Sequence, residues 1–533
     1  MAEERFLLEN ATIYDGSGKP PQRGDVLIEG GFITGCGDIP RWLAPDGTSL
    51  IDLSGLAVSP GFINLHSHSD VQVLTYPEAK TLVMQGITTE VVGNCGGSAV
   101  DTSRWAEDEW RRVLSRSGLP HRWNGVREYL EAVAEVGPAV NVAALFGHGD
   151  IRRAIVGDHG RPMTEAEKTR AAEMAGAYMA EGAFGVSSGL EYVPGRFADV
   201  SELAAVSRPV AERGGFHASH MRNEGPGLLD SIAECIQVTR LSGVRFEVSH
   251  IKACGPDNWG KVREALAMLD AESGLEMTAD FYPYLASSTE LAIVLPDWIL
   301  QEGKERALEL LRGEEVRRNA QAESDARTQA QGGWGRIVIT SVKEARNKWM
   351  EGLDLSMIAG RLGKREPEVV IDILIDEKMQ VRIARFAMSE QDLVEALRHP
   401  KTCVVTDGNN AVPEEGKPHP RSVGTYPRVL GRYARDKGVI SMEEAVKKMT
   451  SLPARRLGIR DRGLIAPGYR ADLVAFDPEK IIDRATYDDP WQYPEGIFAV
   501  FVNGLPVVWE GEMTGKRPGM PLRHEATQRK SIL

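Results

Sequence analysis

The sequence has no apolar run that reaches bilayer-spanning length without charged residues, and its opening residues lack the basic, apolar and small-residue order of a secretory signal. Cysteine is scarce as well. Five residues at wide spacings form an odd set: Cys36, Cys95, Cys235, Cys254 and Cys403. Such a set argues against a disulfide framework. These absences predict a cytoplasmic protein with reduced thiols and no membrane partner.

A basic surface is also lacking. The 533 residues carry 63 Lys and Arg against 76 Asp and Glu, a net charge of −13, and they contain no basic stripe with interleaved aromatic residues. We therefore expect no nucleic-acid partner and interpret the acidic excess as a solvated surface. The length exceeds one ordinary compact domain but suits a large barrel with a companion domain.

Both ends of the chain have the pattern of antiparallel strands. From Arg5 to about Leu56, short alternating runs such as DVLIEGGFITGCG are punctuated by Gly, Asp and Pro. The same pattern returns near the end in ADLVAFDP and GIFAVFVNGLPVVWEG. We predict that residues 1–57 and 464–533 pair into one small β-sandwich beside the central domain.

Residues 58–463 show a different pattern, in which apolar runs alternate with segments of helical spacing. Eight runs are predicted strands: FINLH, TTEVVG, VNVAALFG, FGVSS, GGFHASH, RFEVSH, LEMTADFYPY and TCVVTDG. Eight parallel strands with intervening helices close a barrel, so the predicted fold class is α/β, a (β/α)8 TIM-like barrel. The long stretch between the last two strands, about 291–399, is predicted to be an inserted subdomain or lid.

Residues of metal-ligand type follow several of these strands. His66 and His68 end the first, and a period of two puts both imidazoles on one face. Alone, such a pair is more often two surface histidines. Four more follow other strands, at the rim where barrel enzymes keep their chemistry: Cys95, His220, His250 and Asp407. A thiolate with two imidazoles and an open fourth position predicts a catalytic Zn²⁺ site, with a purely structural zinc as the weaker alternative.

The remaining histidines have ordinary structural interpretations. Those in polar contexts without ligand-type neighbours are His121, His159, His399 and His524. His148 follows the third strand and is a candidate substrate or ligand contact, although a hydrogen-bonded histidine at a strand end is the commoner case. His217 precedes His220 by three residues and need not share its strand face.

Longer motifs extend this pattern over most of the chain: PGFINLHSHSD, GITTEVVGNCG, GVSSGLEYVPG, HASHMRNEG, EVSHIKACGPDNWG, DFYPYLASST, TDGNNA, HPRSVGTYPRVLGRY and DRGLIAPGYRADLVAFDP. In this order they resemble the amidohydrolase superfamily and, within it, the N-acyl-D-amino-acid deacylases, also called D-aminoacylases. The resemblance implies zinc-dependent hydrolysis of N-acyl-D-amino acids to a carboxylate and a free D-amino acid. Within a superfamily such motifs fix the chemistry better than the substrate.

The resemblance also implies one tight zinc on Cys95, His220 and His250, and a weaker second site or a catalytic role for three further residues, His66, His68 and Asp407. Many superfamily relatives bridge two metals with a carboxylated lysine after the fourth strand, but GVSSGLEY offers no lysine there. Glu191 is a candidate substitute, although a carboxylate at such a turn is more often a cap or an ion-pair partner. We therefore expect one essential zinc.

For catalysis, Asp407 is the predicted general base, which takes a proton from the reacting water and passes it to the departing amine. A turn aspartate before Gly408 is the alternative, and the rim position favours catalysis. His68 or His66 is expected to stabilise the oxyanion.

Six side chains are predicted substrate contacts: Lys252, Tyr192, Tyr282, Ser287, Ser288 and Arg385. Lys252, two residues after His250, is placed to supply a cation for the substrate carboxylate. The hydroxyls, including those of the YPYLASST loop, match the family's substrate-contacting region, although packing also explains a Tyr-Pro-Tyr turn. Arg385 is a second candidate cation on a polar segment, where arginine is usually solvated.

Two other interpretations stay open. One is a related enzyme that cleaves cyclic amides, or dipeptides with a D-configured carboxyl-terminal residue; the missing lysine and the presence of Cys95 count against cyclic amides. The other is a non-catalytic scaffold on the same barrel, and the intact set of candidate ligands argues against it.

Overall fold

A parallel eight-stranded sheet forms the centre of the protein. The computed structural model describes residues 4–102, 107–301, 303–413 and 416–525, and of residues 107–109 the backbone alone. The strand order is β16–β12–β11–β10–β9–β8–β7–β6. In chain order the strands are β6 (Phe62–Asn64), β7 (Ile87–Val92), β8 (Asn141–Gly147), β9 (Gly185–Gly189), β10 (Phe216–His220), β11 (Arg245–Val248), β12 (Met277–Phe281) and β16 (Thr402–Val404). Each overlaps one of the eight predicted runs.

The first and last strands of this sheet meet just beyond their ends. The amide of Asp407 donates a hydrogen bond to the carbonyl of His66 (3.0 Å), and the amide of His68 donates to the carbonyl of Gly408 (2.7 Å). These two bonds join β6 to β16 and close the sheet into the predicted barrel. Three candidate ligands therefore flank the closure itself.

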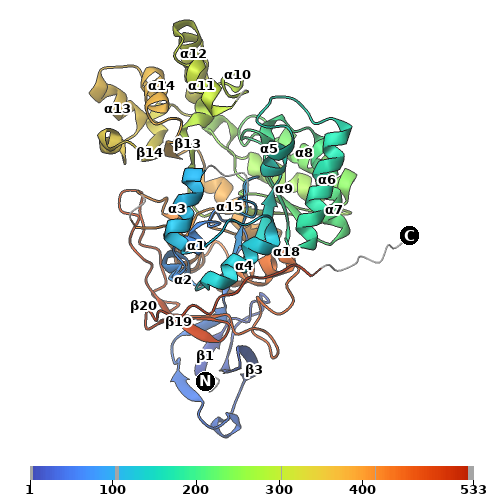
Figure 1. Cartoon of the computed structure of the whole chain (residues 1–533). Helices are drawn as coiled ribbons and strands as arrows, with labels where there is room; N and C mark the ends of the chain where they lie inside the picture. Colours follow the sequence, from blue (N-terminus) through green and yellow to red (C-terminus); the bar gives the residue numbers. More distant parts are fainter. Residues whose placement is uncertain (1–3, 103–106, 302, 414–415, 526–533) are drawn as a thin grey trace.

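Helices surround the barrel and connect its strands (Figure 1). In chain order they are α1 (Gln72–Thr75), α2 (Lys80–Val83), α3 (Glu107–Ser117), α4 (Val126–Val136), α5 (His148–Ile155), α6 (Glu165–Ala180), α7 (Val200–Glu212), α8 (Leu228–Ser242), α9 (Lys261–Ala271), α15 (Glu390–Arg398), α16 (Arg421–Arg428), α17 (Met442–Met449) and α18 (Ser451–Leu457). A π-helix (Val429–Asp436) extends α16, and 3₁₀ turns lie at Gly195–Phe197 and Pro256–Asn258. Among the described helices, none is both long and apolar enough to cross a bilayer.

The two chain ends share one nine-stranded sheet at the opposite end of the molecule from the insertion (Figure 1). Its strands are β1 (Arg5–Ile13), β2 (Gln22–Glu29), β3 (Phe32–Gly37), β4 (Ser49–Asp52), β5 (Ala57–Pro60), β17 (Leu473–Phe476), β18 (Ile497–Val502), β19 (Leu505–Trp509) and β20 (Glu512–Met513). Phe6 on β1 and Phe501 on β18 are three places apart in strand order, about 14 Å in a flat sheet, yet their ring centroids lie 5.4 Å apart. The sheet therefore curls over on itself around a shared core, which is the packing of a sandwich.

The stretch between β12 and β16 folds around a core of its own. It contains a three-stranded sheet, β13 (Ser287–Glu290), β14 (Ile337–Ser341) and β15 (Arg382–Arg385), with helices α10 (Asp297–Leu300), α11 (Lys304–Leu310), α12 (Glu314–Gln329), α13 (Leu355–Leu362) and α14 (Glu366–Asp376). Buried side chains such as Trp334, Ile339, Leu374 and Ile383 fill this core. Ser287 and Ser288, expected in a loop, lie on β13, so the insertion's sheet contributes directly to the rim of the barrel.

Candidate active site

Six candidate ligands from five strand ends converge at the carboxyl-terminal rim of the barrel. Cys95 is central to them: its Sγ lies 3.3 Å from His66 Nε2, 3.6 Å from His250 Nε2 and 3.8 Å from His220 Nδ1. In the set of Cys95, His220 and His250, all ligand atoms lie within 4.8 Å of one another. One tetrahedral cation could contact all three atoms, as the sequence predicts.

A second set shares the same thiol. Cys95 and Asp407 lie with His66 and His68 in a group whose ligand atoms are also within 4.8 Å of one another. Asp407 Oδ1 is 3.1 Å from His68 Nε2 and 3.5 Å from His66 Nε2. Cys95 therefore stands between two possible cation positions, and Asp407 is beside the second.

Three of these residues have an unusual backbone conformation that directs their side chains. Cys95, His250 and Asp407 have φ angles of 55°, 36° and 47°, in the left-handed region that residues other than glycine rarely adopt. Each comes directly after a barrel strand, so the turn directs its side chain towards the other ligands. Backbone strain of this kind persists where the surrounding structure enforces it, and it clusters at functional sites.

Close packing holds the Cys95 turn in place. A Cβ atom on Gly189, at the end of β9, would lie 2.0 Å from the carbonyl oxygen of Cys95. Gly96 has a φ of 82°, and a Cβ there would lie 2.6 Å from the amide nitrogen of Gly189. Only glycine at both positions allows the two strand ends to approach this closely.

The charges of the site favour bound cations. Burial alone would raise the pKa of the Cys95 thiol, but the neighbouring imidazole of His66 and contacts with His220 hold that pKa well below its ordinary value. Burial likewise opposes protonation of His220, yet the nearby Glu224 carboxylate and the Cys95 thiolate raise its pKa to about 10. A thiolate held among imidazoles is a donor set suited to Zn²⁺, which would replace the protons on these groups.

Several acidic residues contact the imidazoles on the side away from Cys95 and orient them. Asp280 Oδ2 is 3.4 Å from His66 Nδ1, and its Oδ1 accepts a hydrogen bond from the amide of His250 (2.5 Å). Glu191 Oε2 is 3.0 Å from His220 Nε2. Glu191 therefore contacts the candidate ligand His220 and has the position of an ion-pair partner. Carboxylates that accept from the far nitrogen of a ligating imidazole fix its orientation and raise its basicity.

Glu224 and Lys252 form a buried pair against His250. Glu224 Oε1 lies 2.9 Å from His250 Nδ1 and 2.5 Å from Lys252 Nζ. Lys252 Nζ also lies 2.7 Å from His250 Nδ1 and donates to the carbonyl of His250 (2.8 Å). Three neighbours thus surround an ammonium group with three donors. Lys252 lines the site, where its charge is compensated by Glu224.

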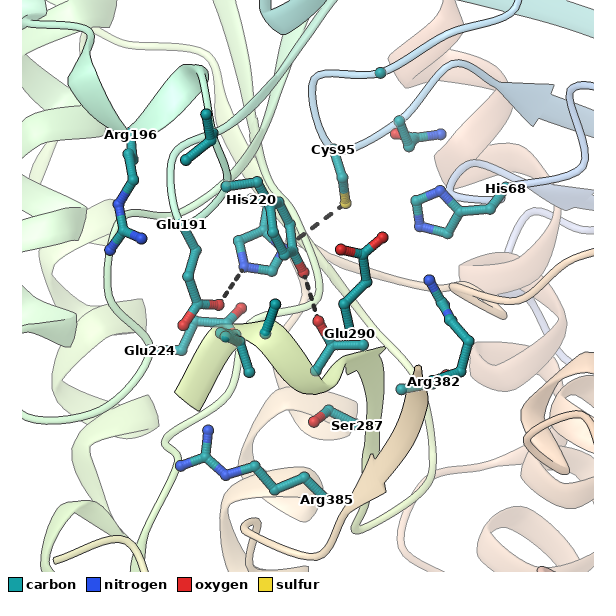
Figure 2. Close-up of a pocket in the computed structure, with 18 of the residues that line it drawn as sticks. His68, Cys95, Glu191, Arg196, His220, Glu224, Ser287, Glu290, Arg382 and Arg385 are labelled. Atoms are coloured by element: carbon teal, nitrogen blue, oxygen red, sulfur yellow. Dashed lines mark hydrogen bonds and ion pairs between the residues drawn. The ribbon is translucent and has the colours of Figure 1, made fainter. Parts of the chain in front are cut away.

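A cavity of about 770 Å³ opens over the ligands and contains every predicted substrate contact: Tyr192, Lys252, Tyr282, Ser287, Ser288 and Arg385. In Figure 2, Ser287 and Arg385, both on the insertion's sheet, lie on the opposite side of the view from Cys95 and His68. Arg385 is half-buried, and its Nη2 is enclosed without a hydrogen-bond partner among the described residues. The hydroxyl of Tyr192 lies 3.3 Å from Thr289 Oγ1.

Three of the other histidines contact structural partners. His148 Nε2 lies 2.9 Å from Glu202, and His399 pairs with Asp270 (3.0 Å). His217 faces the helices and lies 2.8 Å from Ser207 Oγ, and burial lowers its pKa to about 3, so it is neutral. Its face is thus opposite to that of His220.

Three site residues are absent from the sequence-based predictions: Asp280, Glu224 and Arg421. Arg421 Nη1 lies 2.8 Å from Asp407 Oδ2. The sequence does contain a signal for Asp280, because this residue lies inside the buried run TADF and a buried carboxylate needs a compensating partner. Glu224 and Arg421 lie outside the barrel strands, and no periodic pattern marks them.

Comparisons with known proteins give consistent matches. A model described as the amidohydrolase family matches residues 49–284 and 344–508. N-acyl-D-aspartate deacylase from Alcaligenes xylosoxydans xylosoxydans is 35% identical over 98% of this chain and 95% of its own length. A solved structure of D-aminoacylase, whose binuclear metal centre is described by one-metal activation and second-metal attenuation, has a TM-score of 0.81 and 33% identity, and covers 98% of this chain and 99% of that one. A structure of N-acyl-D-glutamate deacylase from Bordetella bronchiseptica, complexed with zinc and a phosphonate mimic of the tetrahedral intermediate, has the same TM-score and 34% identity, with 97% and 99% coverage.

Proposed function

Because this chain belongs to the amidohydrolase family, we propose that it hydrolyses the amide bond of N-acyl-D-amino acids to a carboxylate and a free D-amino acid. The observation that carries the proposal is the convergence of Cys95, His220 and His250 with Asp407 at their edge. Relatives with D-amino-acid substrates in their names support the D configuration. The reduced thiols are consistent with the cytoplasmic location that we expect.

Cys95, His220 and His250 are the residues that would hold the essential zinc ion. When bound, zinc would supply Lewis-acid activation of the carbonyl and of the reacting water. A soft thiolate beside two imidazoles suits this ion better than magnesium or calcium, which prefer oxygen ligands. Occupation of the set around His66 and His68 is not needed for this chemistry, and in the related D-aminoacylase a second metal is attenuating.

Asp407 is the proposed general base. Arg421 keeps it anionic, since that guanidinium lies 2.8 Å from Oδ2 and leaves Oδ1 directed towards His68. An anionic Oδ1 can take a proton from water and later deliver it to the departing amine nitrogen. His66 and His68 line the same edge and would donate to the developing oxyanion.

The substrate carboxylate has a candidate site on the insertion's sheet. Arg385 offers a guanidinium nitrogen without a partner among the described residues, and it is the cross-strand neighbour of Ser287 in the cavity that Tyr192 also lines. Charge-assisted bonds from such a group both bind and orient a carboxylate. The charge of Lys252 is compensated by Glu224, so Arg385 is the cation that this proposal assigns to the substrate carboxylate.

The test is hydrolysis of paired N-acetyl-D- and N-acetyl-L-amino acids by zinc-loaded enzyme, covering Met, Leu, Phe, Glu and Asp. Release of D-amino acid alone, lost in Asp407→Asn, is the expected result. A protein that binds zinc yet hydrolyses none of the pairs would overturn the proposal. Dipeptides with a D-configured carboxyl-terminal residue and cyclic amides are then the next substrates, and a protein without stoichiometric zinc is a scaffold.

A further inference from the structure

A second cavity, of about 510 Å³, adjoins the first at the reacting residues. The two share six lining residues: His68, Gln72, Ser288, Arg382, Asp407 and Asn409. The second cavity extends from this shared wall between α3, β14 and the start of α16. The proposed base thus stands at the boundary between two cavities rather than at the end of one.

Charge distinguishes the two cavities. Six acidic and six basic residues line the first. Seven basic residues line the second, Arg112, Arg116, Lys343, Lys348, Arg382, Lys417 and Arg421, and Asp407 is the only carboxylate among its described lining residues. Asp407 is itself paired with Arg421. In a chain with a net charge of −13, this concentration of one sign inside a concave site would focus a positive potential at the catalytic edge.

Arg382 and Lys343 are among the cations of the second cavity that have no carboxylate partner within the described part of the chain. Arg382 on β15 and Lys343, just after β14, make no side-chain ion pair or hydrogen bond there, whereas Lys348 pairs with Glu351 (2.7 Å). Glu290, the cross-strand neighbour of Arg382, lines the first cavity only and lies 3.4 Å from Lys304. Figure 2 shows Arg382 on the same side of the site as His68.

The substrate amide has an amino-acid half and an acyl half, and the two extend from the reacting amide at Asp407 in different directions. The first cavity contains Arg385 and the hydroxyls proposed for the amino-acid half, so the acyl half would enter the second. Resting on the proposed function, we infer that the acyl group of the preferred substrate ends in an anion. Its chemical class is the monoacyl group of a dicarboxylic acid, such as succinyl or glutaryl. Arg382 and Lys343 bind the terminal carboxylate.

The experiment compares three acyl groups on the D-amino acid that is best hydrolysed as its N-acetyl derivative. N-succinyl carries the terminal carboxylate, N-succinamoyl has a neutral amide at the same length, and N-acetyl lacks the extension. We expect kcat/KM to be at least about tenfold higher for succinyl than for succinamoyl, and this ratio to fall as ionic strength rises. A ratio near one would overturn the inference.

Variants locate the effect. In the double variant Arg382→Gln/Lys343→Gln the ratio of succinyl to succinamoyl should fall towards one, because both compounds keep the same reacting groups. Lys480→Gln, on an exposed lysine outside both cavities, removes a positive charge elsewhere on the surface and should leave the ratio unchanged. A ratio that survives the double variant contradicts the assignment. Failure of the inference is distinct from failure of the proposed function, since in the former N-acetyl-D-amino acids are still hydrolysed.

Discussion

Arg421 and Asp407 form a buried ion pair in which one carboxylate oxygen is held and the other faces the ligands. Arg421 Nη1 lies 2.8 Å from Asp407 Oδ2, and Asp407 Oδ1 lies 3.1 Å from His68. Burial alone would raise the pKa of Asp407, but Arg421 and the nearby His250 hold it well below its usual range. The pair thus determines both the direction and the charge of the proposed base.

Loss of this partner should shift the pH dependence of the enzyme. The folded-state pKa of Asp407 is depressed, so its stabilising charge is present above the unfolded pKa and is lost as pH falls through the folded pKa. In Arg421→Met the folded pKa rises, so activity and stability are both lost at higher pH than in the wild type. Removing one partner of a buried pair also costs about 3–5 kcal/mol.

The measurement is kcat/KM against pH, together with urea unfolding at two pH values. Arg421→Lys keeps the positive charge but not the planar geometry, so its acid limb should lie between those of Arg421→Met and the wild type. Superimposable acid limbs in Arg421→Met and wild type would exclude this role for the pair.

Gly189→Ala should displace the Cys95 turn. Its Cβ would lie 2.0 Å from the carbonyl oxygen of Cys95, so the backbone must move and the thiolate with it. We expect substoichiometric zinc by elemental analysis and a loss of stability of the kind that overpacking causes, about 1–3 kcal/mol.

Gly360→Ala is the matched control for that change. Gly360 lies within α13, and no atom lies within 4 Å of its added Cβ. Alanine at an unhindered helical position should stabilise the fold by roughly 0.5–1 kcal/mol and leave zinc content intact. Full zinc occupancy in Gly189→Ala would refute the packing argument.

Glu224→Gln should weaken metal binding without removing a ligand. The change leaves the Lys252 ammonium without its counter-charge and takes a carboxylate away from His250 Nδ1, 2.9 Å distant. Partners of this kind typically contribute 10- to 100-fold in metal affinity. A competition titration with a zinc chelator measures the difference, and an unchanged dissociation constant would count against the orienting role.

Arg385→Gln should raise KM more than it lowers kcat. Its Nη2 lacks a partner inside the described structure and lines the first cavity, so it is available to the substrate carboxylate. A hydrogen bond to a charged group contributes about 1.5–3 kcal/mol, which corresponds to roughly 10- to 150-fold in kcat/KM. Steady-state kinetics with one N-acetyl-D-amino acid decides this, and a purely kcat effect would show that Arg385 acts elsewhere.

The convergence of the candidate ligands could be predicted from the sequence because the position of each is encoded locally. Cys95 and His250 follow buried strands and His220 ends one, and parallel strands bring their carboxyl ends to one rim. Glu224 and Arg421 could not be predicted in this way, because they meet their partners only when separate loops pack together. The side chain of Lys252 shows the same limit, since its buried counter-charge lies 28 residues away.

The insertion was foreseen, but its attachment to the site was not. β13 pairs with β15 across nearly one hundred residues, and no hairpin signal links Ser287 to Arg385. The alternating texture of the two chain ends did predict their pairing. Pattern alone could not specify that Phe6 and Phe501 would meet through the curl of the sheet.

Because the barrel closes between its first and last strands beside the site, the active site is complete only when the barrel has closed. The backbone bonds between His66 and Asp407, and between His68 and Gly408, join segments about 340 residues apart, and the same four residues include the proposed base and two imidazoles. A chain whose final strand has not docked has neither a sealed cylinder nor a reactive centre. We therefore expect hydrolysis to require the closed barrel.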